Sequence, residues 1–163
     1  MVSFGLAGGL DPALPAGTLV VPAALRLPNG ETVQADSSLV TRLGGPTHRL
    51  MLTSKAPVAR ATEKAKLFAE TGAVAVDLES GAVADAARFR RLPWAVVRAV
   101  CDPAARDLPE AALIGFDPSA GRVAPLRLFR SLLRRPAQIP ALMRLARDAA
   151  AAERTLARFR LAS

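Results

Sequence analysis

Apolar positions along this 163-residue chain alternate between short continuous runs and longer amphipathic stretches. Continuous apolar runs are typical of buried strands, and apolar positions three or four apart are typical of helices. Strands are therefore expected at residues 2–6, 18–27, 48–53, 73–78 and 94–100, and helices at 37–43, 57–71, 80–92, 123–135 and 139–160. The strand–helix–strand alternation from residue 48 to residue 100 implies right-handed crossovers, and it predicts an α/β fold, a three-layer αβα sandwich.

Glycine and proline mark where the expected elements end. Ala7-Gly8-Gly9 is expected to form a tight turn after the first strand, and Asn29-Gly30 is a hairpin signal. Gly72 and Pro93 should end the second and third helices.

Composition narrows the possible classes of protein. The single cysteine excludes an intramolecular disulfide and favours a reducing, cytoplasmic location. No apolar run is long enough to span a bilayer. Aromatic residues make up 4% of the chain and tyrosine is absent, which argues against a stacking surface for single-stranded nucleic acid.

The net charge of +8 is concentrated toward the C-terminus. We expect residues 1–120 to form the α/β domain and residues 121–163 to form basic helices that pack on it. Such a tail is compatible with a solvated arginine face or with attraction to an anionic surface, either a membrane or a nucleic acid. The scarce aromatic residues and the acidic motif residues argue against nucleic acid as the partner. The apolar positions of the expected helix at 123–135 fit membrane contact and packing on its own domain equally well.

Two polar strings lie where predicted strands end. Asp77-Leu78-Glu79-Ser80 lies at the end of one strand, and the string from Arg98 to Asp102 lies at the end of another. Because ligands bind at the carboxyl ends of strands in open α/β sheets, we expect these carboxylates to meet at one edge. Carboxylates there can hold a sugar and protonate a leaving group. Asp77 is interpreted instead as a cap or brace for the next helix.

These strings resemble the motifs of the superfamily of purine nucleoside phosphorylases and methylthioadenosine/S-adenosylhomocysteine nucleosidases. Residues 75–80 are similar to its D-M-E signature, and residues 97–102 are similar to its R-x-x-S-D signature. Residues 5–10 and 15–21 look like its glycine motif and following strand. The resemblance covers about residues 2–110.

Within this superfamily, the segments at residues 3–12 and 71–77 most resemble the hopanoid-associated phosphorylases, also described as adenosylhopane nucleosidases. The resemblance implies an enzyme that cleaves a purine N-glycosidic bond and releases adenine, with adenosylhopane as substrate in hopanoid lipid biosynthesis. It also implies a homo-oligomer. A methylthioadenosine/S-adenosylhomocysteine nucleosidase and a non-catalytic nucleoside-binding module remain open alternatives.

Three residues are the catalytic candidates. Cleavage of the glycosidic bond builds positive charge on the ribose and negative charge on the base. Asp102, with a pKa raised by a water-poor pocket, should protonate the base, and Glu79 should grip the ribose hydroxyls. Arg98 should hold phosphate or orient water. Without the motifs, Glu79 could be a helix-terminal carboxylate, Asp102 a turn residue and Arg98 a surface arginine.

Five more positions are candidates for substrate binding. Ala7, Gly8 and Gly9 let backbone N–H groups approach a sugar or an anion. Leu78 stands where the superfamily usually has Met, and Cys101 where it usually has Ser. Cys101 is interpreted as a small buried thiol, since no nucleophile dyad surrounds it.

The sequence also departs from the superfamily pattern. No metal site or cofactor is expected, and phosphate is the one co-substrate that the resemblance allows. Leu6 stands where phosphorylases often have Ser or Thr in contact with phosphate. This difference favours water over phosphate as the acceptor. The superfamily normally has a strand upstream of the glycine motif that contributes to the nucleophile side. We find no counterpart here and expect an incomplete N-terminal part.

Overall fold

The computed structural model describes residues 1–110, 112, 116–117, 122–123 and 138–159. The strands are β1 (Val2–Gly9), β2 (Leu19–Val20), β3 (Pro22–Arg26), β4 (Thr32–Gln34), β5 (His48–Thr53), β6 (Ala75–Asp77), β7 (Ala95–Asp102), β8 (Phe116–Asp117) and β9 (Arg122–Val123). The helices are α1 (Ser37–Arg42), α2 (Ala61–Thr71), α3 (Ser80–Phe89) and α6 (Ile139–Arg158).

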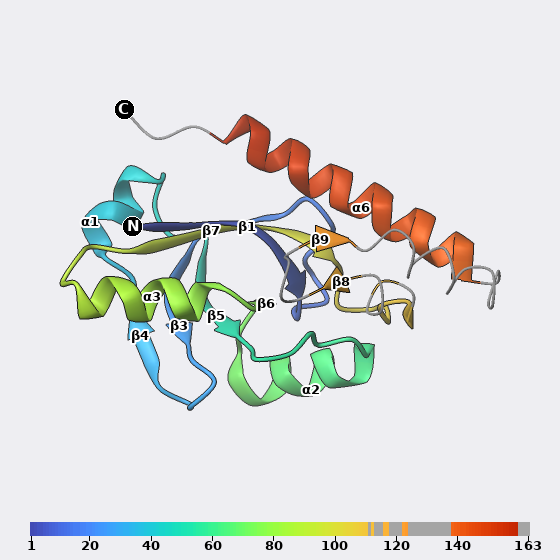
Figure 1. Cartoon of the computed structure of the whole chain (residues 1–163), viewed down its shortest axis with the longest axis horizontal. Coiled ribbons are helices and arrows are strands. Elements are labelled where there is room, and N and C mark those ends of the chain that lie inside the picture. The colour runs from blue at the N-terminus through green and yellow to red at the C-terminus, as the bar shows by residue number, and fades with distance from the viewer. Residues whose placement is uncertain (111, 113–115, 118–121, 124–137, 160–163) are drawn as a thin grey trace.

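Within the described residues, seven strands form one mixed sheet with the order β2-β7-β1-β6-β5-β3-β4. Helix α6 runs along one face of this sheet and α3 lies on the opposite face (Figure 1). Side chains of α3 pack with Val96 and Val100 of β7, while Leu156 of α6 packs with Ala95 and Val97. Because neighbouring strand residues point to opposite faces, these contacts confirm the predicted α/β class with helices on both sides.

Several local predictions are confirmed. Strand β5 has the predicted bounds of 48–53, and Asn29-Gly30 lies in the turn between the antiparallel strands β3 and β4. Gly72 ends α2 in a left-handed conformation with φ of 67°, and its N–H donates to the Phe68 carbonyl. Glycine adopts this conformation at no steric cost, which explains the stop signal.

Two predicted strands are wrong in extent. Residues 7–9 are not a turn, because β1 continues to Gly9 between β6 and β7. The run at 18–27 is divided at Val21 into β2, which pairs with β7, and β3, which pairs with β5. Since one residue connects strands that are five places apart in the sheet order, the sheet must curl until these strands meet.

The relative directions of neighbouring strands also differ in part from the prediction. Strands β5 and β6 are parallel neighbours, as expected. Strands β6 and β7 are separated by β1, which is parallel to β7 and antiparallel to β6. The carboxyl ends of β6 and β7 therefore do not meet at one edge.

The C-terminal helix is tied to the sheet by polar and apolar contacts. The Thr155 hydroxyl donates to the Gly17 carbonyl at 2.8 Å, and Phe159 contacts Phe4 with ring centroids 6.1 Å apart. This helix corresponds to the one predicted at 139–160. The helix predicted at 123–135 lies outside the described residues except for Val123, which belongs to β9. Among the helices of the described segments, none has the length and apolar character needed to cross a bilayer.

Candidate active site

Arg98, in the middle of β7, is the centre of a buried polar cluster. Its side chain is 3% exposed, and one terminal nitrogen, Nη2, lies 2.5 Å from the Asp77 carboxylate. The same nitrogen donates to the Ser3 hydroxyl at 2.7 Å and to the Ser80 hydroxyl at 3.2 Å. It also reaches Glu79 Oε2 at 3.4 Å. The cluster thus joins β1, β7 and the β6–α3 junction through one guanidinium group.

Asp77 braces this junction, as the sequence suggested. Its Oδ2 accepts hydrogen bonds from the Ser80 backbone N–H at 3.1 Å and the Ser80 hydroxyl at 2.6 Å. Two buried atoms of the pair, Asp77 Oδ1 and Arg98 Nε, have no hydrogen-bond partner. Glu79, by contrast, is 74% exposed at its side chain and is the carboxylate of this cluster that is open to a ligand.

Gly5 makes room for the guanidinium. It is paired in register with Arg98 on the neighbouring strand. A Cβ atom at position 5 would lie 2.3 Å from Arg98 Nη1, far inside van der Waals contact. The absence of a side chain at this position therefore allows Arg98 to lie across β1.

Asp102, at the end of β7, belongs to a second cluster. Its Oδ2 accepts a hydrogen bond at 2.6 Å from the ammonium group of Lys64 on α2, which is 0% exposed. The same ammonium donates to the carbonyls of Arg106 at 2.9 Å and Pro103 at 3.2 Å. All three donors of the lysine are thereby used.

Opposing effects act on the carboxyl group of Asp102. Burial raises the pKa of Asp102 above its ordinary value, while the hydrogen bond and charge of Lys64 and the charge of Arg106 act to lower it. Burial dominates, so the pKa is raised, in the direction that the sequence predicted for an acid. The sequence did not anticipate the lysine that opposes this shift.

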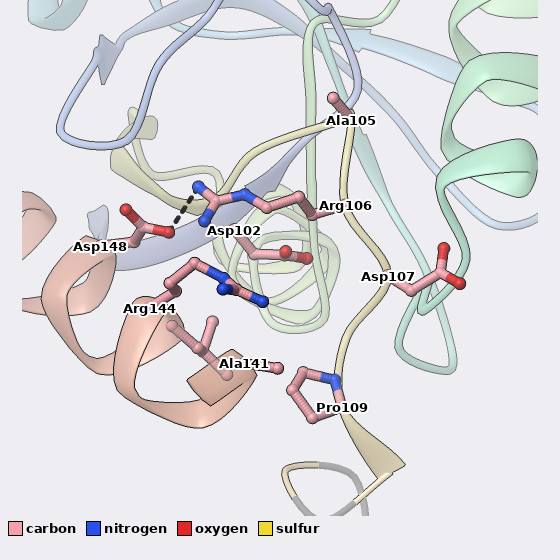
Figure 2. A pocket seen from close by; sticks show the side chains of 9 residues that line it. Asp102, Ala105, Arg106, Asp107, Pro109, Ala141, Arg144 and Asp148 are labelled. Atoms are coloured by element: carbon pink, nitrogen blue, oxygen red, sulfur yellow. Dashed lines mark ion pairs between the residues drawn. The ribbon is translucent and has the colours of Figure 1, made fainter. Parts of the chain in front are cut away.

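A cavity of about 410 Å³ opens beside Asp102. Its wall combines the segment after β7 with the first turns of α6 (Figure 2). Arg106 forms a 2.6 Å ion pair with Asp148 across this wall, and Arg144 points into the same space (Figure 2). The cavity therefore offers Asp102 together with hydrogen-bond donors to whatever it holds.

The predicted catalytic residues lie in two clusters and not at one strand edge. Glu79 and Arg98 lie together, whereas Asp102 lies further along β7 with Lys64. The reason is the antiparallel β1–β6 pairing, which brings the end of β6 back along β1. Arg98 pairs with Gly5 and Asp102 pairs with Gly8, three residues further along β1. Three residues of strand span about 10 Å, which is the distance between the clusters along the sheet.

The candidate binding residues have distinct surroundings. Gly8 pairs with Asp102, and a Cβ there would lie 3.7 Å from Asp102 Oδ2. Ala7 is 4% exposed in the core, whereas Leu78, beside Glu79, is 41% exposed. A Cβ at Gly9 would lie 3.2 Å from Val100 Cγ1, so this glycine allows close packing.

Cys101 is only partly buried, in contrast to the buried thiol that was expected. Burial raises its pKa to about 11, and the neighbouring Asp102 carboxyl adds to the effect. A thiol with this pKa stays protonated and is a weak nucleophile.

Sequence reasoning missed Lys64, Ser3 and Ser80. For Lys64 a signal was present, because helical spacing places position 64 on the same face as the apolar positions 61, 65 and 68. A lysine on a buried helix face requires a partner. In the described part of the chain, no group of three or more His, Cys, Asp or Glu side chains is arranged to hold a metal ion.

The chain belongs to the phosphorylase superfamily, whose pattern it matches over residues 1–134. No curated protein matches it at a significant level.

Solved structures with a similar fold include several nucleosidases. One is the methylthioadenosine/S-adenosylhomocysteine nucleosidase of Colwellia psychrerythraea in complex with adenine, with 22% identity, a TM-score of 0.57 and coverage of 63% of this chain and 53% of that one. Another is the S-adenosylhomocysteine nucleosidase of Streptococcus pyogenes in complex with 5-methylthiotubericidin, with 23% identity, a TM-score of 0.58 and coverage of 63% and 54%. A third is a futalosine hydrolase mutant of Helicobacter pylori, with 19% identity, a TM-score of 0.54 and coverage of 65% and 58%. The chain thus spans little more than half the length of these proteins, and the similarity establishes the fold.

Proposed function

We propose that this chain binds an adenine nucleoside and cleaves its N-glycosidic bond. Membership of the phosphorylase superfamily supports this function, as does a fold shared with nucleosidases, one of which was solved with adenine. The observation that carries the proposal is the position of Asp102, whose buried carboxyl lines a cavity of about 410 Å³.

The two clusters divide the nucleoside between them. The base occupies the cavity beside Asp102, where the carboxyl can pass a proton to a ring nitrogen as the bond breaks. The ribose lies toward Glu79, whose exposed carboxylate accepts hydrogen bonds from the hydroxyls and favours positive charge on the sugar. The separation of about 10 Å along the strands is comparable with the length of a nucleoside.

Arg98 takes a supporting part in this arrangement. Its buried Nη2 is hydrogen-bonded to Ser3 and Ser80 and paired with Asp77. We therefore assign Arg98 to orienting Glu79 in place of the phosphate-holding or water-orienting role that the sequence suggested. Water is the proposed acceptor, with phosphate as the alternative that the assay distinguishes.

The proposed substrate carries an apolar group at its 5′ carbon, with adenosylhopane as the specific candidate. This choice rests on the resemblance of residues 3–12 and 71–77 to the hopanoid-associated subgroup. The protein should act as a homo-oligomer, and peripheral contact of the C-terminal helices with a membrane would bring it to such a substrate.

Adenine release tests the reaction. The purified chain is incubated with adenosine, 5′-methylthioadenosine and a 5′-alkyl adenosine, each with and without phosphate. Asp102→Asn should lower the rate about 10²- to 10⁴-fold, the usual contribution of a general acid. Asp85→Asn, an exposed aspartate on α3, is the matched control and should leave the rate unchanged.

The outcomes separate the alternatives. Preference for the 5′-alkyl substrate supports the lipid-linked nucleoside, and preference for 5′-methylthioadenosine assigns the protein to the other nucleosidase class. Release that needs phosphate identifies a phosphorylase. Binding of adenosine by folded protein without any release would refute catalysis and leave a nucleoside-binding module.

A further inference from the structure

The Lys64–Asp102 pair is the most unusual feature of the site. Lysine is almost never fully buried unless it is paired, yet Lys64 is the largest fully buried side chain in the described part of the chain. Its ammonium group contacts one carboxylate and two backbone carbonyls. This environment satisfies every donor and holds the ammonium directly against Asp102.

The surrounding backbone fixes this arrangement. The Ala61 N–H, at the start of α2, donates to Asp107 Oδ1 at 2.7 Å. The Leu108 N–H donates to the Ala59 carbonyl at 2.8 Å. The segment after β7 is therefore tied to the start of the helix that carries Lys64, and the lysine does not depend on a ligand for its position.

Stability alone does not account for the pair. Apolar residues of similar volume in place of a buried ion pair are often neutral or stabilising, because desolvation of two charges offsets their attraction. A buried lysine and aspartate at the wall of a cavity are better explained by the chemistry that they can perform there.

That chemistry concerns the source of a proton. With the ammonium donating to it, Asp102 at rest is an acceptor, and an ionised carboxylate has no proton to give. The cations of the cavity wall, Arg106 and Arg144, are guanidinium groups that do not release protons in proteins. Lys64 is in direct contact with Asp102 and carries a proton that can be transferred.

We propose that Lys64 is a positioning residue that fixes Asp102 through Oδ2 and stores the proton which Asp102 passes to the departing base. This inference rests on the proposed function. The C1′–N9 bond breaks, its electron pair goes to the base, and Asp102 delivers a proton to a ring nitrogen. Lys64 supplies that proton and is left as a neutral amine. Water adds to C1′ and releases a proton, which restores the ammonium of Lys64. Where phosphate is the acceptor, the proton that restores the ammonium comes from solvent.

The central experiment is the pH dependence of kcat for Lys64→Met. Without the lysine, burial raises the pKa of Asp102 with less opposition, but the carboxyl must then arrive protonated by itself. The rate should therefore fall about 10²-fold at alkaline pH and recover on acidification, with KM little changed. The alkaline limb of the profile should therefore move to lower pH. Lys66→Met is the matched control, since Lys66 is 72% exposed on the same helix, and it should leave the profile unchanged.

Charged and titratable groups around Asp102 come from several elements. They are Lys64 on α2, Cys101 on β7, Arg106 and Asp107 after β7, and Arg144 and Asp148 on α6. All of these groups except Lys64 remain in the Lys64→Met protein, so a moved alkaline limb is attributable to the lysine.

Other profiles would overturn the proposal. An equal loss of kcat at every pH means that Lys64 acts through geometry alone. A limb displaced to higher pH means that the lysine only holds Asp102 ionised. Lys64→Arg keeps the charge but does not release a proton, so activity near wild type in this variant would also refute proton storage.

A measurement without turnover separates this inference from the proposed function. The infrared band of a protonated carboxyl, assigned to Asp102 by its loss in Asp102→Asn, should be absent from the wild type at neutral pH. In Lys64→Met the band should grow in on acidification. A protonated Asp102 band in the wild type at neutral pH would overturn the storage role, whereas failure of the wild type to release adenine would refute the proposed function.

Discussion

Replacement of Arg98 by Met tests how the buried cluster is held together. The change leaves the Asp77 carboxylate, 3% exposed at its side chain, without its cation, and Asp77 Oδ1 already lacks a hydrogen-bond partner. Removal of one member of a buried ion pair costs about 3–5 kcal/mol. Because domains of this size are stable by about 5–15 kcal/mol, about a fifth or more of the total stability should be lost.

An exposed pair in the same protein provides the control. Arg88 and Glu31 are 2.7 Å apart, close to the Arg98–Asp77 distance, but their side chains are 44% and 43% exposed. Exposed ion pairs contribute about 0–1 kcal/mol, so Arg88→Met should change stability by no more than that. The difference between the two variants reports the effect of burial together with the hydrogen bonds of Arg98 to Ser3 and Ser80.

Urea unfolding followed by circular dichroism measures both changes, provided that the slope with denaturant is unchanged. Combining Arg98→Met with Asp77→Asn removes the uncompensated charge and should recover at least half of the lost free energy of unfolding. The reasoning is refuted if the double variant is no more stable than Arg98→Met alone. It is also refuted if Arg98→Met costs no more than Arg88→Met.

Three further predictions concern single positions. Gly5→Ala should lower the free energy of unfolding by about 1–3 kcal/mol in urea titrations, because its Cβ would force Arg98 to move; an unchanged midpoint contradicts the close contact. Cys101 should react with a thiol reagent at pH 8 about 10²-fold more slowly in the folded chain than in urea, since its raised pKa keeps it protonated; equal rates would show an ionised thiol. Thr155→Val removes the hydrogen bond to Gly17 and should cost about 1 kcal/mol, with faster amide exchange in α6; unaltered exchange would mean that this bond does not anchor the helix.

Local signals in the sequence predict local structure well. The strand at 48–53, the Asn29-Gly30 turn and the stop at Gly72 all depend on residues adjacent in the chain, and all are found. The prediction that Asp77 braces the next helix is also confirmed, because an aspartate three residues before a serine N–H is within reach of it.

Sheet order could not be predicted in the same way. Pairing of β1 with β6 in one direction and with β7 in the other is decided by contacts between distant segments. Glu79 and Asp102 were expected at one edge of the sheet because the strands before them were assumed to be parallel neighbours. The motifs identified the residues of the candidate site, but their separation into two clusters follows from this tertiary pairing.

The glycine motif shows how two sequence signals form one structural feature. Gly5 and Gly8 are three residues apart on β1, whereas their register partners Arg98 and Asp102 are four residues apart on β7. The register shifts between Ala7 and Gly8, which leaves Cys101 as the additional residue of a β-bulge. Bulges redirect side chains beside active sites. The glycines that resembled a turn therefore accommodate the Arg98 guanidinium and the Asp102 carboxyl, and the bulge at Cys101 lets one strand serve both clusters.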